Sequence, residues 1–385
     1  MSNDRKFLLV ILLLTGLAFP AVAQEKDPLY RRVLEKIRTL DAGLDPAFIY
    51  QLDPHWSVAL TGGVRQAGIR QDYSFLTNMS RMDDHGIIEE RDSPSWMSSS
   101  LQGPVEGVAG LQVGYGNVGL SFSQRVSRNG EDRNRNFSFD YLSSGYAVQL
   151  QYFDFTQPMD FRLTISEPGE WDYYSDGGKT RNPGRMQTFI ADMFYFFNNQ
   201  RFSYPAVYKG TKIQRRSAGS WMFGTKVINS ILENDPEEEL SLWTGGLAKE
   251  STLQVSVGGG FSYNYVPFHR QPAGNGLKGL RNLTFNVTFL PMVTLFNQFT
   301  TTFRILLGGD FDTRVNTMYG NLLVNYVART GVSYTWDRMQ VNLSGSYDSY
   351  RYRGVNKIEG VVDDRVETTG RFERWNVSLR LCRMF

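Results

Sequence analysis

The sequence predicts an all-β fold, a transmembrane antiparallel β-barrel of about fourteen strands, with twelve strands as the alternative. A cleaved signal peptide and a short periplasmic helix are expected to precede it. Three observations lead to this class: an export signal at the start, segments in which apolar and polar residues alternate, and an alternation that continues to the last residue, Phe385. Aromatic residues make up 14% of the chain and 37 of its 385 residues are glycine, which suits strands joined by turns.

Residues 1–23 are predicted to be a secretory signal peptide. Arg5 and Lys6 form a short positive region, an apolar run follows, and "AVA" at 21–23 supplies small residues for cleavage. No cysteine stands at the cleavage site, so we expect a mature chain without a lipid anchor that starts at Gln24. After this segment no apolar run reaches the roughly 20 residues that a transmembrane helix needs.

Residues 24–55 are predicted to form a periplasmic segment ahead of the barrel. Asp27 can cap a helix that has Pro28 at its first position, and apolar residues spaced three apart from Leu34 to Leu40 share one face. We interpret this segment as a short periplasmic helix or as a plug that touches the barrel mouth. A mobile leader is the alternative, because short helices are marginally stable.

Residues 56–385 are predicted to form the outer-membrane barrel, because apolar and polar residues alternate with a period of two. In 375–381, for example, the apolar residues from Trp375 to Leu381 face one way and the polar residues from Asn376 to Arg380 face the other. The expected strands are 56–65, 106–115, 118–126, 134–142, 146–155, 186–197, 201–208, 213–227, 251–264, 279–291, 298–308, 320–336, 338–350 and 372–385.

The connections give the expected orientation, since outer-membrane barrels have short periplasmic turns and long outer loops. The weak part of this assignment is 201–227, because Pro205 stands in its first half and proline cannot donate to a sheet ladder; twelve strands is therefore the alternative. The same strand assignment makes 228–250 a long connection on the periplasmic side. Short turns are expected near 116–117, 143–145, 198–200, 297–298 and 337–338, and long outer loops at 66–105, 156–184, 265–278 and 351–371.

Charge and cysteine content narrow the function classes. The chain has 41 Lys and Arg against 39 Asp and Glu, and this balance gives no reason to expect nucleic-acid binding. The single cysteine, Cys382, excludes an intramolecular disulfide. We expect no cofactor.

Export and the barrel pattern together predict that the protein lies in the outer membrane of a Gram-negative bacterium. The expected partners are outer-membrane lipid and the barrel-assembly machinery, which would recognise Phe385 as an insertion signal.

The sharpest cluster of candidate reactive residues lies in the expected loop at 81–92. Asp83, Asp84 and His85 could activate a water molecule, and the acidic residues around them could hold Ca²⁺. A solvated acidic loop is the favoured interpretation, because charge runs are usually solvated. We therefore assign no catalytic residue and no metal ligand, and a hydrolase at the outer rim is the least favoured function.

Alternation also predicts which polar side chains line the lumen. Two interpretations remain open: a pore lining that sets solute preference, or a set of paired charges that fills a closed lumen. Because both charge signs are present, we lean toward a plugged or narrow lumen. The candidates are Asp140, Gln149, Gln151, Asp192, Arg216, Lys226, Arg304, Asn325, Arg329, Asp348 and Arg380.

Three stretches resemble a known family. They are "FFNNQRFSYPAVYKGTKIQRRSAGSWMFGTKV" at 196–227, "VTFLPMVTLFN" at 287–297 and "LDPAFIYQLDPHWSVAL" at 44–60. They are similar to the family called domain of unknown function 4421. The resemblance implies an exported outer-membrane β protein without an assigned activity, and it brings no catalytic residues. A channel or transporter for a small solute is the favoured function, and a structural or partner-binding barrel in an envelope assembly is the alternative.

Overall fold

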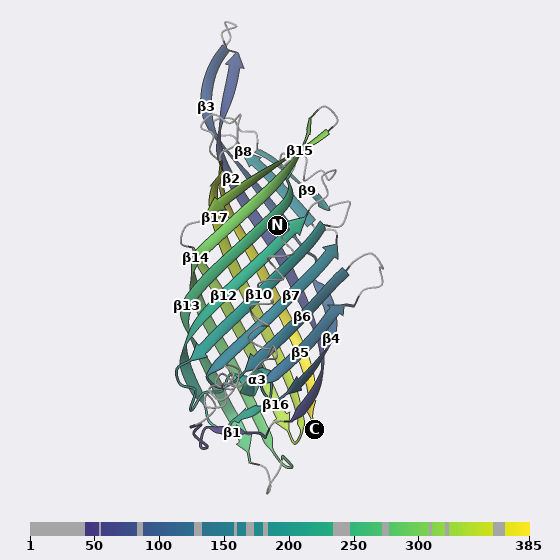
Figure 1. Ribbon diagram of the computed structural model, residues 1–385, viewed down its shortest axis with the longest axis vertical. Helices are drawn as coiled ribbons and strands as arrows, with labels where there is room; N and C mark the ends of the chain where they lie inside the picture. The colour runs from purple at the N-terminus through teal and green to yellow at the C-terminus, as the bar shows by residue number, and fades with distance from the viewer. Residues whose placement is uncertain are drawn as a thin grey trace, which may run out of the picture.

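The chain forms a closed antiparallel β-barrel of twelve strands (Figure 1). The computed structural model describes residues 43–53, 55–82, 88–126, 133–157, 160–166, 173–179, 184–233, 247–271, 277–307, 310–319, 323–356 and 366–385. The predicted signal peptide, the predicted helix after Asp27 and the cluster from Asp83 to His85 lie outside these residues. No helix within the described ranges is long and apolar enough to cross a membrane.

The ring follows the chain order, and each strand pairs with the next strand of the ring. It closes where the last strand pairs with the first, from Val366 opposite Phe75 to Met384 opposite Ser57. The ring strands are β2 (Trp56–Met82), β4 (Glu106–Tyr115), β5 (Val118–Arg125), β6 (Arg133–Leu142), β7 (Tyr146–Gln157), β10 (Gly184–Phe196), β12 (Ala218–Glu233), β13 (Leu247–Arg270), β14 (Arg281–Leu307), β16 (Val324–Trp336), β17 (Met339–Asn356) and β18 (Val366–Met384).

The two ends of the barrel differ. One end, which we call the turn end, carries the short turns at 116–117, 143–145 and 337–338 and the C-terminus. The opposite end, the loop end, carries strands that extend the wall beyond the ring (Figure 1). These are β3 (Ile88–Gln102) beside β2, β8 (Asp160–Ser166) beside β3, β9 (Tyr173–Lys179) beside β8, and β15 (Asp310–Tyr319) beside β14.

Two errors account for the prediction of fourteen strands, and the alternative of twelve is confirmed. Residues 201–208 are not a strand, because they form a turn and the short helix α3 (Pro205–Tyr208). The predicted strands 279–291 and 298–308 belong to one strand, β14, since the expected turn at 297–298 continues the ladder. Asn297 has 2% of its surface exposed, so its amide marks an inward-facing position and not a turn.

Because the predicted order contains these two extra strands, it gives the wrong direction to every strand that lies between them in the sequence. The segment 228–250 was expected at the periplasmic side, but β12 and β13 meet it at the loop end. The segment 265–278 is predicted to be an outer loop, but residues 265–270 belong to β13, which meets β14 at the turn end. The predicted loop 66–105 is largely the long hairpin of β2 and β3, which rises above the rim in Figure 1.

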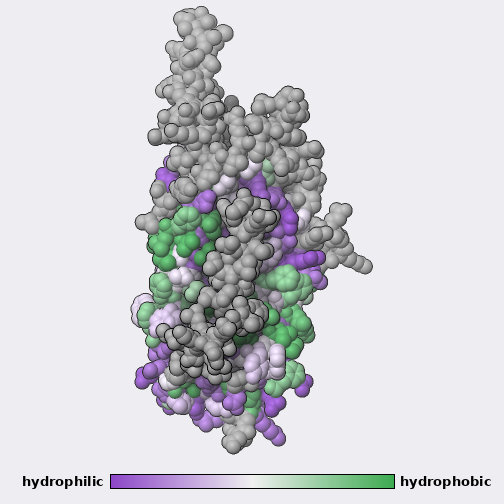
Figure 2. Space-filling model, viewed as in Figure 1, coloured by the Kyte–Doolittle hydropathy of each residue, from purple (hydrophilic) through white to green (hydrophobic). Residues whose placement is uncertain are grey.

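Alternation places apolar side chains on the outside of the wall. Leu60, Leu295 and Leu379 each have more than half of their surface exposed, whereas many inward-facing neighbours are buried and polar. On the face seen in Figure 2, hydrophobic side chains gather across the middle of the barrel and hydrophilic ones toward its two ends. An apolar outer band of this kind is typical of a wall that faces lipid.

The C-terminal residue takes part in the closure of the ring. The backbone N–H of Phe385 donates to the Trp56 carbonyl at 2.9 Å, so the last residue is held against the start of the first strand. Its ring is 58% exposed and lies 5.4 Å from the guanidinium carbon of Arg383. The alternation predicted for the terminal strand therefore continues to the end of the chain.

Candidate functional site: the barrel lumen

A segment between β10 and β12 folds back into the lumen at the turn end. We call residues 198–217 the plug; it contains α3 and the short strand β11 (Lys212–Gln214). Pro205 stands at the first position of α3, where its missing N–H costs no helical hydrogen bond. Phe202, Tyr204 and Val207 are fully buried, and the Tyr204 ring stacks on Phe196 with centroids 5.2 Å apart. Aromatic packing thus fixes the plug against the end of β10.

The wall is shaped to receive the plug. Gly331 of β16 faces α3, and a β-carbon at this position would lie 2.8 Å from a Val207 methyl group. At Gly119 of β5 a β-carbon would collide with the Lys209 ammonium and the Asp140 carboxylate, which form an ion pair. The absence of a side chain at Gly331 and Gly119 therefore leaves room for the plug against the wall.

A second short strand holds the plug from the turn end. β1 (Ile49–Gln51) pairs with β11, with Ile49 opposite Gln214. The Gln214 amide accepts from the Ser203 N–H at 2.9 Å and donates to the Arg201 carbonyl at 2.6 Å. Part of the segment predicted to precede the barrel, residues 49–51, therefore lies in contact with the plug.

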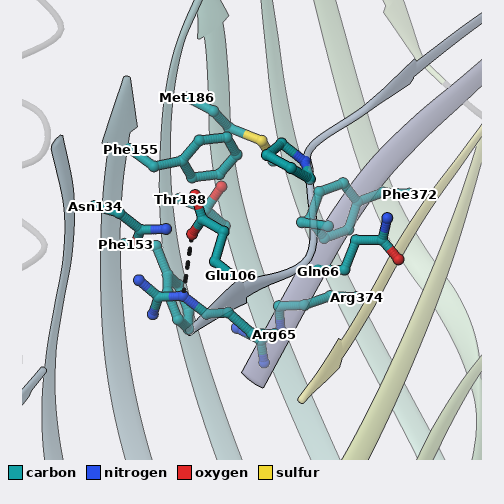
Figure 3. Close-up of a pocket in the computed structure, with 12 residues that line it drawn as sticks. Arg65, Gln66, Glu106, Asn134, Phe153, Phe155, Met186, Thr188, Phe372 and Arg374 are labelled. Atoms are coloured by element: carbon teal, nitrogen blue, oxygen red, sulfur yellow. Dashed lines mark ion pairs between the residues drawn. The ribbon is translucent and has the colours of Figure 1, made fainter. Parts of the chain in front are cut away.

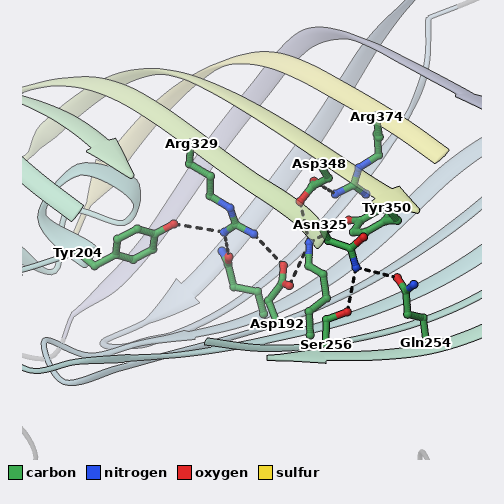
Figure 4. A network of polar contacts seen from close by, with 11 residues as sticks. Asp192, Tyr204, Gln254, Ser256, Asn325, Arg329, Asp348, Tyr350 and Arg374 are labelled. Atoms are coloured by element: carbon green, nitrogen blue, oxygen red, sulfur yellow. Dashed lines mark hydrogen bonds and ion pairs between the residues drawn. The ribbon is translucent and has the colours of Figure 1, made fainter. Parts of the chain in front are cut away.

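Above the plug, five charged side chains cross the lumen. Asp192 of β10 and Lys226 of β12 come from one side of the ring, and Arg329, Asp348 and Arg374 come from β16, β17 and β18 on the other (Figure 4). Lys226 Nζ lies 2.7 Å from Asp348 Oδ1 and 3.2 Å from Asp192 Oδ1. Arg329 Nη2 lies 2.7 Å from Asp192 Oδ2, and Arg374 Nη2 lies 2.8 Å from Asp348 Oδ2. We call this set the lumen network.

The lumen network connects the plug to the wall. Arg329 Nη1 donates to the Tyr204 hydroxyl at 3.2 Å, and the same nitrogen donates to Gln149 of β7. All five charged side chains are at least nine-tenths buried. Buried charges are tolerated only when they are paired. Two of the ion pairs, Lys226–Asp348 and Arg329–Asp192, restrain strands on opposite sides of the ring.

Toward the loop end, the lumen becomes apolar. Phe155, Met186 and Phe372 border a small cavity of about 40 Å³ together with Phe153 (Figure 3). The Phe153 ring has the Arg374 guanidinium 4.4 Å from its centroid. The cation–π contact links this apolar chamber to the lumen network below it.

A larger polar cavity lies between Tyr208 of the plug and a continuous arc of the wall that runs from β17 through β18, β2, β4, β5 and β6 to β7. Its volume is about 240 Å³. Its lining is rich in hydroxyl and amide groups, including Gln112, Ser121, Ser138, Gln151 and Asn342. These groups donate and accept hydrogen bonds, so the cavity is suited to a small polar molecule or to water.

The structure places most of the predicted lumen residues together. Asp192, Lys226, Arg329 and Asp348 belong to the lumen network, and Gln149 contacts it. Gln151 lines the polar cavity. The remaining three inward-facing candidates bind neighbours in the lumen: Asp140 pairs with Lys209, Asn325 donates to Ser256 at 3.0 Å, and Arg380 donates to Gln112 at 2.6 Å.

Arg216 does not line the lumen, which corrects the prediction. The expected strand began at residue 213, but β12 begins at Ala218, so Arg216 lies exposed in the turn before it. Its guanidinium carbon lies 5.9 Å from the Phe48 ring centroid. Arg304 lies where β14 pairs with β15, opposite Thr313, and only its backbone position is described.

Sequence reasoning missed three central residues. Arg374 shares the inward face of β18 with Phe372 and Arg380, and the period-two pattern of 372–385 already contained that signal. Tyr204 and Lys209 gave no such signal, because they lie in the plug and not on a wall strand. Among the described residues no three His, Cys, Asp or Glu side chains are grouped so that they could hold a metal ion.

The fold is a closed antiparallel β-barrel with a plug in its lumen and an apolar band on its outer face, an arrangement typical of transmembrane barrels. The family model described as domain of unknown function (DUF4421) matches residues 97–360, well over half of the chain, and the chain therefore belongs to this family. The stretches 196–227 and 287–297 lie inside the matched residues, whereas 44–60 lies outside them. A search of curated proteins found no match.

Solved structures resemble the chain weakly. The P. putida toluene transporter TodX is 10% identical with a TM-score of 0.19, covering 90% of this chain and 94% of that chain. The outer-membrane protease OmpT from Escherichia coli is 7% identical with a TM-score of 0.24, covering 87% and 99%. A FadL homologue from Pseudomonas aeruginosa is 10% identical with a TM-score of 0.18, covering 86% and 90%. Likenesses at such TM-scores carry no inference about activity.

Proposed function

We propose that the protein is a gated barrel of the outer membrane that passes a small polar solute, with the plug and the lumen network as its gate. The observation that carries this proposal is the polar cavity of about 240 Å³ beside a plug that hydrogen bonds as well as aromatic packing hold to the wall. Export by the predicted signal peptide and insertion by the barrel-assembly machinery belong to the same proposal.

The contacts between plug and wall support a gate. The Tyr208 hydroxyl donates to Asn286 at 2.9 Å, Asn264 donates to the Ser203 carbonyl at 2.8 Å, and Gln340 donates to the Ala206 carbonyl at 3.2 Å. Water can replace each of these hydrogen bonds, so the net free energy lost when one is exchanged is about 1 kcal/mol. Exchange of these hydrogen bonds for water therefore adds little to the cost of moving the plug, and the aromatic packing around Tyr204 sets most of that cost.

A reversible crosslink tests whether the plug moves. Val207→Cys and Gly331→Cys, in a Cys382→Ser background, place two thiols where α3 meets β16, and the loss of one Val207 methyl group makes room for the new side chain at 331. In planar bilayers we expect the reduced variant to conduct like the wild type and the oxidised variant to lose its openings. Cys382→Ser alone, treated with the same oxidant, is the control. A wild-type barrel that folds but neither conducts nor admits small polar solutes into proteoliposomes would overturn the proposal.

The hairpin of β2 and β3 favours a second candidate, a partner-binding barrel in an envelope assembly. Pairing of β2 with β18 ends at Phe75, and pairing of β3 with β8 ends at Trp96. Beyond these positions 76–82 and 88–95 pair only with each other among the described residues, so each strand presents an unpaired edge. Unpaired edges can accept a strand from a partner.

A shortened hairpin tests this second candidate. Replacing residues 77–93 by an Asn-Gly turn keeps the ring and removes the projecting ribbon. We expect the variant to retain heat-dependent electrophoretic mobility but to lose the crosslinked species that the wild type forms in intact envelopes. Identical crosslinking patterns for the two proteins would exclude the hairpin as the contact.

A further inference from the structure

Four arginines form a row across the wall of the barrel. The register places Arg351 of β17 opposite Arg371 of β18, and Arg371 opposite Arg70 of β2. The row continues through Ser100 of β3, which lies opposite both Arg70 and Arg162 of β8. Residues directly opposite each other on neighbouring strands share one face of the sheet. With strands about 4.8 Å apart, the row extends over about 19 Å.

The row lies on the outer face of the wall. The chain neighbours Gln71 and Phe372 point into the lumen and are buried. The side chains of Arg70 and Arg371 are 67% and 42% exposed. The other two arginines of the row are exposed as well.

The row borders the apolar band. Along the outer face of β18, the exposed apolar residues Leu379 and Val377 are followed toward the loop end by Trp375, and then by Arg371. The indole N–H of Trp375 donates to the Gln66 side chain at 3.1 Å. Tryptophan is enriched at the level of lipid head groups, so the arginines lie where head groups meet the wall.

The charges in the row are only partly offset. Like charges directly opposite each other on neighbouring strands are destabilising. Glu373 lies 2.5 Å from Arg371 and Asp72 lies 3.5 Å from Arg70, and both pairs are exposed. No ion pair of Arg351 or of the arginine on β8 is found in the described part of the chain. An anionic group bound to the row would therefore relieve repulsion that the protein itself leaves in place.

A hollow accompanies the row. Its volume is about 480 Å³, and its lining includes Arg70, Arg162 and Arg371 together with Ser98, Ser100 and one carboxylate, that of Glu373. Gly68 lies on the outer face between Gln66 and Arg70, and its missing side chain leaves the floor of the hollow open. Three guanidinium groups around one hollow match the geometry of phosphate oxygens, which arginine binds in a bidentate manner.

The geometry points to a binding site for the phosphorylated head group of a lipid in the outer leaflet, on the outer wall formed by β17, β18, β2, β3 and β8. We define the row site as Arg70, Arg162, Arg351 and Arg371. The site requires that the apolar band lies in the membrane, as the proposed function does, but it does not require that the barrel passes a solute. Conductance and lipid binding can therefore fail separately.

Lipid titration of the purified barrel tests the site. The midpoint of thermal unfolding, measured by heat-dependent electrophoretic mobility, is followed in neutral micelles as bisphosphorylated lipid A is added. Binding to the folded barrel raises that midpoint. Dephosphorylated lipid A and inorganic phosphate serve as separate probes. We expect the bisphosphorylated lipid alone to raise the midpoint at micromolar concentration.

Variants identify the residues. Arg70→Gln with Arg371→Gln should raise the half-saturating lipid concentration at least about tenfold, because two charge-assisted contacts are lost. Arg353→Gln is the matched control, since Arg353 is exposed on β17 but pairs with Glu367 at 2.5 Å outside the hollow. It should bind like the wild type.

Each remaining outcome is decisive. Should the double variant fail to fold, Arg162→Gln replaces it, because β8 lies outside the ring and the change leaves ring closure intact. Weaker binding by that variant supports the site. Unchanged binding by both variants, a wild type without a shift, or equal shifts with dephosphorylated lipid would overturn it. A shift with inorganic phosphate at the same concentration would also overturn the lipid assignment.

Discussion

Replacing Asp348 by asparagine should destabilise the barrel by several kilocalories per mole. The Asp348 carboxylate accepts hydrogen bonds from Lys226 Nζ at 2.7 Å and from Arg374 Nη2 at 2.8 Å, and its side chain is 1% exposed. The lumen network holds three cations and two anions, and the substitution leaves three cations against one anion. Lys226 keeps Asp192 at 3.2 Å, but Arg374 retains no carboxylate among the described residues.

The magnitude follows from the burial of the network. Removing one partner of a buried ion pair costs about 3–5 kcal/mol, because the other charge is left without compensation. A hydrogen bond to a charged group contributes about 1.5–3 kcal/mol, and Asp348 accepts two of them. We therefore expect Asp348→Asn to lower the free energy of unfolding by about 3–5 kcal/mol.

The assay is urea unfolding in detergent micelles, with the folded fraction measured from the mobility of unboiled samples. The pair Lys249–Glu233 offers a matched control, because its nitrogen–oxygen distance is also 2.7 Å but its side chains are 36% and 41% exposed. Glu233→Gln should cost under about 1 kcal/mol. Equal losses for the two variants, or a loss below about 1 kcal/mol for Asp348→Asn, would refute the reasoning.

Three further predictions concern the plug and the chain end. Gly119→Ala should weaken the Lys209–Asp140 ion pair, because the new methyl group takes the space of the Lys209 ammonium group; limited trypsin digestion of intact barrels should then cut faster at Lys209 and Lys212, which are buried in the wild type. Tyr204→Phe should lower the free energy of unfolding by about 1 kcal/mol, since one hydrogen bond from Arg329 is lost while stacking remains; urea titration measures this. Phe385→Ala should reduce the amount of folded barrel in the outer-membrane fraction, and equal amounts would dismiss the insertion signal.

Period-two patterns gave a correct account of the wall. In the last strand Val377, Leu379 and Leu381 face outward and Arg380 faces inward, as the alternation predicted. The same pattern would also have found Arg374. Alternation succeeds here because successive side chains of a strand point to opposite faces whatever the strand pairs with.

The number of strands could not be predicted with the same success. Pro205 indicated correctly that 201–208 is not an ordinary strand, but the doubt extended over 201–227, of which residues 218–227 belong to β12. Nothing in the sequence indicated that the predicted strands 279–291 and 298–308 are one strand, because Asn297 is of a residue type that is common in turns. Whether an amide ends a strand or points into the lumen depends on the partner strand, which local sequence does not specify.

The sequence by itself predicted a signal peptide, and it determined the class of the fold and the face on which each wall residue lies. Only the tertiary structure decided which of those residues meet. The lumen network joins Asp192 to Arg329, and the row site joins Arg70 to Arg371, across separations that no local pattern encodes. The physical reason is that alternation specifies a face, whereas closure of the ring specifies the register, and register alone sets which charges face each other.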